Sequence, residues 1–321
     1  MGGSGRPGWI GYNKLVFMVG FKRSQLDSDC IMKLCTFTKD GFPRVGARIG
    51  EEIVDSQGTK GIPTDMLGFL AAGSSARERL ADLTEQGANR VPVSETVLEA
   101  PVPNPSKFLA ISLNYGKHIA ETGRDRPEYP SFFNKQTSCV TGPGSPIHRP
   151  RVSEKLDYEG ELALVIGKRC RHVPREEAGG VIAGFMVAND VSVRDWQIRS
   201  PTFTLGKSFD THGPIGPWIV TSDEIADPHN LHVQTWVNDE QRQSFNTGEM
   251  IFNCFEQIEY LSTVMTLEPG DIISTGTGSG VGVKMKPRGY MKAGDRVRIE
   301  IEGIGTLENS VVEEPESTTC F

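Results

Sequence analysis

The sequence predicts an α+β protein built mainly of strands, with a β-sandwich or a rolled, barrel-like sheet as its larger part. Three observations lead to this fold class: many short apolar segments, frequent Gly and Pro turns between them, and few helical stretches. The chain has 321 residues, which is enough for one large domain and a smaller one. We therefore expect a small α+β domain on the N-terminal side and a larger, strand-rich domain after it.

The small domain is expected over residues 32–100. Two strand-like segments, MKLCTFT and RVGARIGEEIVDS, are separated by a turn at 39–43, and a helical stretch follows at about 64–86. The next segment, 101–106, contains the run PVPNP, and prolines interrupt helices and central strands. It is therefore expected to be an extended linker.

The large domain is expected over residues 107–314. Helices are expected at 115–122 and 250–265, and the remainder is dominated by short strands. The strand-like segments are KFLAISL, ELALVIG, GVIAGFMVAND, PWIVTS, LHVQTWVND, DIISTG and DRVRIEIEGIGTLENSVVEE. Residues 315–321 follow the last of them and are expected to form a frayed tail.

Residues 1–31 precede the first expected strand. Their apolar patch, at 15–21, is shorter than a typical signal-peptide core and lacks a small-residue cleavage site. We interpret this segment as a disordered extension, a cloning-derived sequence or a misplaced start.

Composition narrows the function classes. The formal net charge is −7 and no cluster of Lys and Arg is present, so nucleic acid is not expected as a partner. No apolar run approaches the roughly 20 residues of a membrane span, so no membrane partner is expected either. The six cysteines form no CxxC pair and no zinc-like spacing, which is typical of reduced thiols in a cytoplasmic protein.

Three carboxylates are the strongest candidates for a functional site. Glu159 and Glu161 are two residues apart in a strand-like segment, so both side chains point to the same face. Asp190 closes another apolar run. Like charges at the end of core strands are costly unless positive charge lies between them, and an all-carboxylate set suits Mg²⁺ or Mn²⁺ better than zinc. The alternative is a solvated strand face paired with Lys or Arg.

His118 and Glu121 are the candidate acid–base pair. They are three residues apart at the start of an expected helix, so they share a helix face. A carboxylate beside an imidazole orients the ring and raises its basicity, as a general base that deprotonates water requires. The alternative is a surface ion pair, which is common on helices.

Three further residues that follow Asp190 in the sequence are candidates for binding the substrate or stabilising its charge. Arg194 is suited to gripping a carboxylate at two points, although it also fits a structural ion pair with a nearby acid. Lys207 lies in a segment bounded by Gly and Pro and would supply positive charge to a developing oxyanion, or be solvated. We also keep His212 as a candidate substrate contact.

A glycine-rich segment, STGTGSGVG at 274–282, follows an expected strand. It lacks the GK[ST] ending of a P-loop, and Pro287 interrupts the helix that a dinucleotide fingerprint needs. We interpret it as a tight loop whose Thr hydroxyls and backbone N–H groups face a small anionic ligand.

Six segments in order resemble the fumarylacetoacetate hydrolase superfamily, in its acylpyruvase or 2-hydroxyhepta-2,4-diene-1,7-dioate isomerase-like branch. They are NYGKHIAE, DYEGELALVIGK, ANDVSVRDWQ, LGKSFDTHGPIGPW, EPGDIISTGTGSGVG and KAGDRVRIEIEGIGTLENSV. The similarity runs from Lys107 to Val312, and the region from Met32 resembles the small N-terminal domain of many members. Two departures are Gly278, where the family loop often has Pro, and His212, where it often has an aromatic or small residue.

The resemblance implies a mixed β-roll catalytic domain, a homodimer and a small-molecule keto-acid substrate. It implies Mg²⁺ or Mn²⁺ as the cofactor. The residues that match the family's metal ligands are Glu159, Glu161 and Asp190. Those that match its catalytic and substrate-binding residues are His118, Glu121, Lys207, Arg194, Gln197 and Thr277.

The resemblance also implies chemistry on keto acids through a metal-stabilised enolate. Because both His118 and Glu121 are present, we expect a hydrolase that cleaves a C–C bond of a β-diketo acid such as an acylpyruvate. The alternative is a decarboxylase or isomerase of 2-oxo-dioic acids, such as oxaloacetate or aromatic ring-cleavage products. A protein of another class, which only senses a keto acid, is the third possibility.

Overall fold

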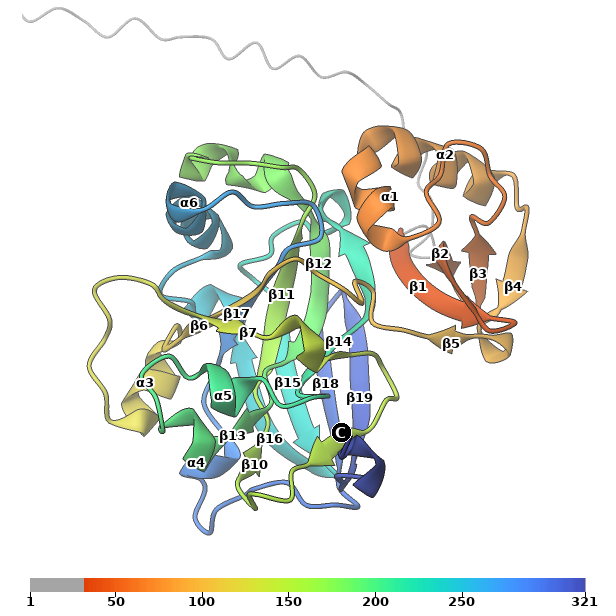
Figure 1. Ribbon diagram of the computed structural model, residues 1–321. Coiled ribbons are helices and arrows are strands. Elements are labelled where there is room, and N and C mark those ends of the chain that lie inside the picture. Colours follow the sequence, from red (N-terminus) through yellow and green to blue (C-terminus); the bar gives the residue numbers. More distant parts are fainter. Residues whose placement is uncertain (1–31, 321) are drawn as a thin grey trace, which may run out of the picture. The chain divides into compact units, whose positions relative to one another are not determined.

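The computed structural model describes residues 32–320, and strands make up more of them than helices (Figure 1). This confirms the predicted α+β class dominated by β structure. The predicted extension at 1–31 lies outside the described residues.

The main sheet has twelve strands. Ten of them run in the order β4, β3, β2, β1, β14, β12, β11, β17, β6 and β7, while β5 pairs with β1 and β8 pairs with β14. Their bounds are β1 (Lys33–Lys39), β2 (Phe42–Ile49), β3 (Glu52–Asp55), β4 (Arg90–Pro92), β5 (Val97–Leu98), β6 (Phe108–Ser112), β7 (Ser131–Lys135), β8 (Val140–Thr141), β11 (Gly160–Ile166), β12 (Ile182–Asn189), β14 (Gly213–Thr221) and β17 (Ile272–Thr277).

A five-stranded sheet and a two-stranded pair complete the β structure. The five-stranded sheet contains β16 (Glu240–Asn246), β15 (His232–Val237), β18 (Arg296–Ile301), β19 (Gly305–Glu313) and β9 (Ile147–Arg149). The pair consists of β10 (Leu156–Asp157) and β13 (Ser192–Val193). Apolar side chains from both larger sheets, among them Leu162, Val233 and Ile299, share one buried cluster.

The helices are short and connect strands. Their bounds are α1 (Met66–Ala72), α2 (Ser74–Glu85), α3 (Gly116–Thr122), α4 (Arg194–Gln197), α5 (Thr204–Lys207) and α6 (Cys254–Val264). The 3₁₀ helices are η2 (Val93–Glu95), η3 (Thr137–Cys139), η4 (Arg175–Val181), η5 (Ser222–Glu224), η6 (Thr247–Glu249), η7 (Gly282–Lys284) and η8 (Glu316–Thr318). Within residues 32–320, no helix is both long and apolar enough to cross a membrane.

Two helix boundaries differ from the expectation. The stretch at 64–86 is two helices, because Gly73 adopts a φ of 64° and breaks it between α1 and α2. The helix expected from 250 begins at Cys254, because the Asn253 side chain accepts hydrogen bonds from the Phe255 and Glu256 amides. Glu256 in turn accepts from the Asn253 amide and closes a capping box.

Residues 32–100, where a small α+β unit is expected, contain strands β1 to β5 and the helices α1 and α2, which pack on these strands. Val54, Met66, Phe69 and Leu80 belong to one buried cluster there (Figure 1). Its first strand also extends the main sheet, because Leu34 of β1 pairs with Ile219 of β14. The domain limits at 101–106 and 315–321 remain predictions.

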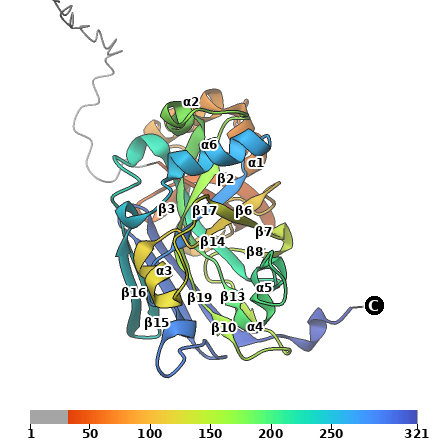
Figure 2. The ribbon, with the colours of Figure 1, turned by 90° about the vertical axis from the view of Figure 1, so that its left-hand side faces the viewer.

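Two central strands position the functional residues. Every residue of β11 and β12 is buried, as expected of apolar runs in the middle of a covered sheet. The two strands are antiparallel, and Gly160 pairs with Asn189. This register brings the start of β11 next to the end of β12. Figures 1 and 2 both place α3, α4 and α5 at the end of the sheet where β10 and β13 lie.

Candidate active site

The structure brings the three predicted carboxylates together. Glu159 and Glu161 flank Gly160 at the start of β11, and Asp190 follows Asn189 at the end of β12. One carboxylate oxygen from each lies within 4.8 Å of the other two. The three residues are only 6%, 1% and 1% exposed, which excludes the solvated strand face.

Two buried lysines form ion pairs with these carboxylates. Lys207 Nζ is 2.7 Å from Oε2 of Glu159 and 2.6 Å from Oδ2 of Asp190. Lys135 Nζ is 2.7 Å from Oδ1 of Asp190 and also donates to the carbonyl oxygen of Lys207. The protein therefore supplies part of the positive charge that the acidic cluster requires. The alternative of a solvated Lys207 is wrong, because this residue is only 2% exposed.

Arg194 forms ion pairs, and one of its guanidinium nitrogens remains available to donate a hydrogen bond. Its Nε donates to Asp157 over 2.8 Å, and its Nη1 is 2.7 Å from Oε1 of Glu159 and 3.0 Å from Oε1 of Gln197. Its Nη2 is buried and has no hydrogen-bond partner among residues 32–320. Two guanidinium nitrogens, Nε and Nη1, thus hold Asp157 and Glu159, while the third, Nη2, remains to bind a ligand.

Glu161 is the carboxylate with the least balanced charge. Its Oε2 accepts from Ser274 Oγ over 2.7 Å and from the Gly276 amide over 2.8 Å, but within residues 32–320 it forms no ion pair. Burial, followed by the negative charges of Asp190 and Glu159, holds the pKa of Glu161 well above its usual range. Glu159 differs: burial opposes its ionisation, yet Lys207 and Arg194 hold its pKa below its ordinary value.

This donor set fits a hard divalent cation. Three buried carboxylates converge from two neighbouring strands, and one of them, Glu161, forms no ion pair within the described residues 32–320. Oxygen-only ligands of this kind suit Mg²⁺ or Mn²⁺. We therefore treat Glu159, Glu161 and Asp190 as the candidate metal ligands.

His118 and Glu121 form the predicted pair on α3. Nδ1 of His118 is 2.7 Å from Oε1 of Glu121, whose Oε2 accepts from the Gly280 amide over 3.1 Å. Because a carboxylate accepts at Nδ1, this nitrogen carries the proton and Nε2 is left as the basic nitrogen. The His118 side chain is 11% exposed, which argues against an ordinary surface ion pair.

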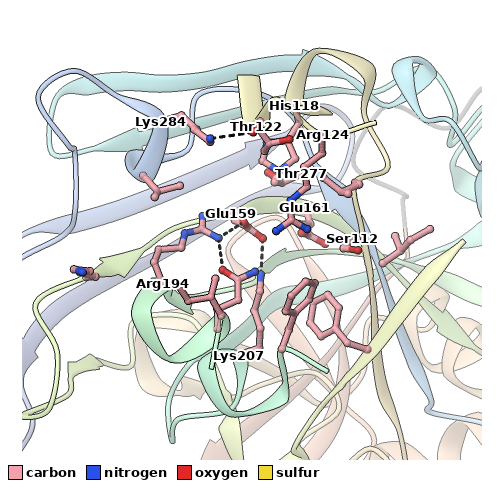
Figure 3. A pocket seen from close by; sticks show the side chains of 18 of the residues that line it. Ser112, His118, Thr122, Arg124, Glu159, Glu161, Arg194, Lys207, Thr277 and Lys284 are labelled. Atoms are coloured by element: carbon pink, nitrogen blue, oxygen red, sulfur yellow. Dashed lines mark hydrogen bonds and ion pairs between the residues drawn. The ribbon is translucent and has the colours of Figure 1, made fainter. Parts of the chain in front are cut away.

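One cavity of about 350 Å³ connects these groups, as Figure 3 shows. Its walls come from α3, β11, α4, α5 and the loop after β17. The predicted site residues that line it are His118, Glu159, Glu161, Arg194, Gln197, Lys207 and Thr277. Glu121 and Asp190 do not line it: Glu121 is hydrogen-bonded to His118, and Asp190 is ion-paired with Lys207.

His212 is not a substrate contact, and that expectation is wrong. Its ring is fully buried, and Nε2 donates to the carbonyl oxygen of His148 over 2.8 Å. Burial lowers the pKa of His212 to about 3, so the ring is neutral at ordinary pH. The ring packs against Phe209, and His212 does not line the cavity.

The glycine-rich segment serves the site in another way than expected. β17 extends through Thr277, whose hydroxyl donates to the carbonyl oxygen of Gly160 over 2.8 Å. The amides of Gly276, Gly280 and Gly282 donate to Glu161, Glu121 and Asp157 respectively. The prediction that these N–H groups face a ligand is wrong, because they orient carboxylates of the protein itself.

Four functional residues were absent from the sequence prediction: Lys135, Asp157, Ser274 and Gln243. Asp157 holds Arg194, Ser274 holds Glu161, and Gln243 donates to the Thr277 hydroxyl over 2.8 Å. Asp157 lies two residues before Glu159, so the alternation that singled out the metal ligands would have revealed it. No local pattern marks the other three.

Gly206 offers a direct test of how Lys207 is placed. A Cβ at this position would overlap the backbone N and Cα of Gln197, so α4 and α5 would have to separate. We expect Gly206→Ala to lose about 1–3 kcal/mol of stability and at least tenfold in kcat/KM. Thermal unfolding and steady-state kinetics measure both. The matched control is Gly180→Ala, where a Cβ meets no atom within 4 Å. Equal behaviour of the two variants would contradict the argument.

Comparisons with known proteins agree with this architecture. Residues 107–312 match the family described as fumarylacetoacetate (FAA) hydrolase, C-terminal. The chain is 40% identical over 275 residues to the mitochondrial oxaloacetate tautomerase of Xenopus laevis, covering 84% of this chain and 86% of the relative.

Two solved structures share the fold. Maleylpyruvate hydrolase from Sphingobium sp. SYK-6, in complex with Mn²⁺ and pyruvate, has a TM-score of 0.75 and 34% identity, covering 88% of this chain and 100% of its own. Fumarylacetoacetate hydrolase from Exiguobacterium antarcticum has a TM-score of 0.78 and 36% identity, with the same coverage. The chain belongs to the fumarylacetoacetate hydrolase family of enzymes.

Proposed function

We propose that the protein catalyses proton transfer at the carbon next to the ketone of a small 2-oxo-dioic acid such as oxaloacetate. This chemistry gives keto–enol tautomerisation. Loss of CO₂ from the same acid would instead break the C–C bond to the distal carboxylate and leave an enolate without removal of a proton. The observation that carries the proposal is the convergence of the acidic triad, Arg194 and the His118–Glu121 pair on one cavity. The identity to an oxaloacetate tautomerase over most of both chains supports it.

Each residue has a role in this proposal. Glu159, Glu161 and Asp190 would hold a divalent cation, which supplies the positive charge that makes an oxyanion on the substrate tolerable. The free Nη2 of Arg194 binds the carboxylate beside the ketone, and the amide of Gln197 lies next to it.

His118 is the group that moves the proton. Its Nε2 removes the proton from the carbon, and Glu121 stabilises the imidazolium that results. The same proton is returned to the enolate oxygen or to the carbon, so the reaction needs no further reactant. Lys207 keeps Glu159 and Asp190 in place and adds positive charge near the developing oxyanion.

Cleavage of a C–C bond in a β-diketo acid is the second candidate function. The His118–Glu121 pair favours it, because activation of an attacking water requires a base, whereas decarboxylation requires none. The similarity to maleylpyruvate hydrolase also supports it. The tautomerase proposal takes precedence because the oxaloacetate tautomerase of Xenopus laevis is more similar in sequence.

A turnover screen with the purified protein separates these functions. Enol absorbance and CO₂ release are followed with oxaloacetate, and C–C cleavage with acetylpyruvate and maleylpyruvate, each with Mg²⁺, with Mn²⁺ and with EDTA. We expect oxaloacetate turnover that EDTA abolishes and added Mg²⁺ or Mn²⁺ restores. Faster cleavage of a β-diketo acid would favour the hydrolase. Ligand-dependent melting without any turnover would favour a binding protein.

Three further expectations stay predictions: a homodimer, the choice between Mg²⁺ and Mn²⁺, and a cytoplasmic location. Size-exclusion chromatography with light scattering tests the first, and metal titration tests the second. The Xenopus laevis relative is a mitochondrial protein by name, so fractionation of cells is the experiment that tests the third.

A further inference from the structure

The outer wall of the cavity carries positive charge that no carboxylate balances. Arg124, Lys155 and Lys284 line it, and within the part of the chain that the structure describes none of them forms an ion pair. The inner cations differ, because Lys207 and Arg194 each contact Glu159. Unpaired cations at the wall of a cavity favour an anionic ligand.

Two of these cations lie on the side of the cavity formed by α3. Lys284 Nζ donates to the carbonyl oxygen of Thr122 over 3.3 Å, and Arg124 is two residues beyond Thr122. Figure 3 shows Lys284, Thr122 and Arg124 on the side of the cavity where His118 lies, opposite Lys207. The contact with Thr122 also holds the long Lys284 side chain, which reduces the entropy lost when it binds a ligand.

Lys155 belongs to another part of the wall. Its carbonyl oxygen accepts a hydrogen bond from the Arg194 amide over 3.0 Å. The backbone of Lys155 therefore lies beside Arg194, the residue that we propose binds the substrate carboxylate next to the ketone. Asp195, the remaining acid in the wall, accepts from Ser153 over 2.6 Å. Arg124 and Lys284 are therefore the pair positioned to bind a second anionic group at a distance from Arg194.

We propose that Arg124 and Lys284 form the subsite for the distal carboxylate of the substrate. They thereby set the preference for a 2-oxo diacid over a 2-oxo monoacid. This inference rests on the proposed function, in which Arg194 holds the carboxylate beside the ketone. A guanidinium provides paired donors for a carboxylate, and the ammonium of Lys284 provides a point charge beside it.

The test compares two substrates that differ in this carboxylate. Deuterium exchange at C3 is followed by NMR for oxaloacetate and for 2-oxobutanoate, which has a methyl group in its place. We expect Lys284→Met and Arg124→Gln each to lower the ratio of kcat/KM for oxaloacetate to that for 2-oxobutanoate about tenfold, mainly through KM. Lys284→Arg is expected to retain most of the ratio.

The chain offers matched controls two residues further on. Lys286→Met and Arg126→Gln remove the same charges from residues that do not line the cavity, and they should leave the ratio as in the wild type. An unchanged ratio in Lys284→Met and Arg124→Gln, or an equal change in the controls, would overturn the subsite.

Failure of the subsite is distinguishable from failure of the proposed function. Wild-type protein that exchanges neither substrate contradicts the function. Calorimetric titration with the same two acids, in the presence of Mg²⁺, then decides the subsite alone. Weaker oxaloacetate binding in Lys284→Met, but not in Lys286→Met, supports it, and equal binding overturns it.

Discussion

Replacing Glu161 with glutamine is expected to remove divalent-cation binding and to stabilise the metal-free protein. The amide keeps an oxygen that accepts from Ser274 and Gly276, and its NH₂ group faces Asp190 and Glu159 in place of a third negative charge. We expect Mn²⁺ affinity to fall about a hundredfold or more and turnover to fall with it, because the cation loses one of three anionic ligands. Stability without metal should rise by about 1 kcal/mol, or roughly 2–4 °C in Tm.

Calorimetric titration with Mn²⁺ and thermal unfolding in EDTA measure the two effects. Glu302→Gln is the control, because Glu302 is exposed and remote from the triad in the sequence. The idea of a cation site at the triad would not survive if Glu161→Gln bound Mn²⁺ as tightly as the wild type. A fall in stability in EDTA would show instead that Lys135, Lys207 and Arg194 already balance the cluster.

Replacing His118 with asparagine is expected to lower kcat by about 10²–10⁴ without weakening metal binding, because a general base contributes about that factor. Within residues 32–320, His118 is hydrogen-bonded to Glu121 and forms no hydrogen bond with the triad, so the Mn²⁺ affinity should stay within about twofold. Glu121→Gln should cost less, since the ring remains and only its orientation and basicity change. The double variant should be about as slow as His118→Asn alone, because the two residues act as a unit.

His232→Asn is the control for this series, because that ring is exposed and hydrogen-bonded to Ser244 on the five-stranded sheet. Steady-state kinetics with oxaloacetate and Mn²⁺ titration are run on all variants. If His118→Asn turned over as fast as the wild type, another group would have to move the proton.

The fold class could be predicted because burial leaves a direct trace in the sequence. β11 and β12 are buried throughout, so they appear as apolar runs, the first with Glu159 and Glu161 at its start and the second with Asp190 at its end. Helix ends were less predictable, since they depend on single residues such as Gly73 and Asn253. The predicted start of α6 at residue 250 was wrong, because the capping box at Asn253 begins the helix at Cys254, after the apolar residues that suggested an earlier start.

The core of the site could also be predicted, because it depends on short-range geometry. Glu159 and Glu161 share a face through the two-residue period of a strand, and His118 and Glu121 share one through the turn of a helix. These spacings are fixed by backbone geometry and require no knowledge of the rest of the fold. The substrate roles of Gln197 and Thr277 came from family resemblance, and they stay predictions.

By itself, then, the sequence determined that Glu159 and Glu161 share a strand face and that His118 and Glu121 share a helix face. Only the tertiary structure decided what surrounds them: Lys135 is 55 residues from Asp190, and Ser274 is 113 residues from Glu161. In the tertiary structure the Gly280 amide of the glycine-rich loop also donates to Glu121, and Lys284 donates to the carbonyl oxygen of Thr122. Strand register and loop closure set such contacts, and no spacing along the chain encodes them.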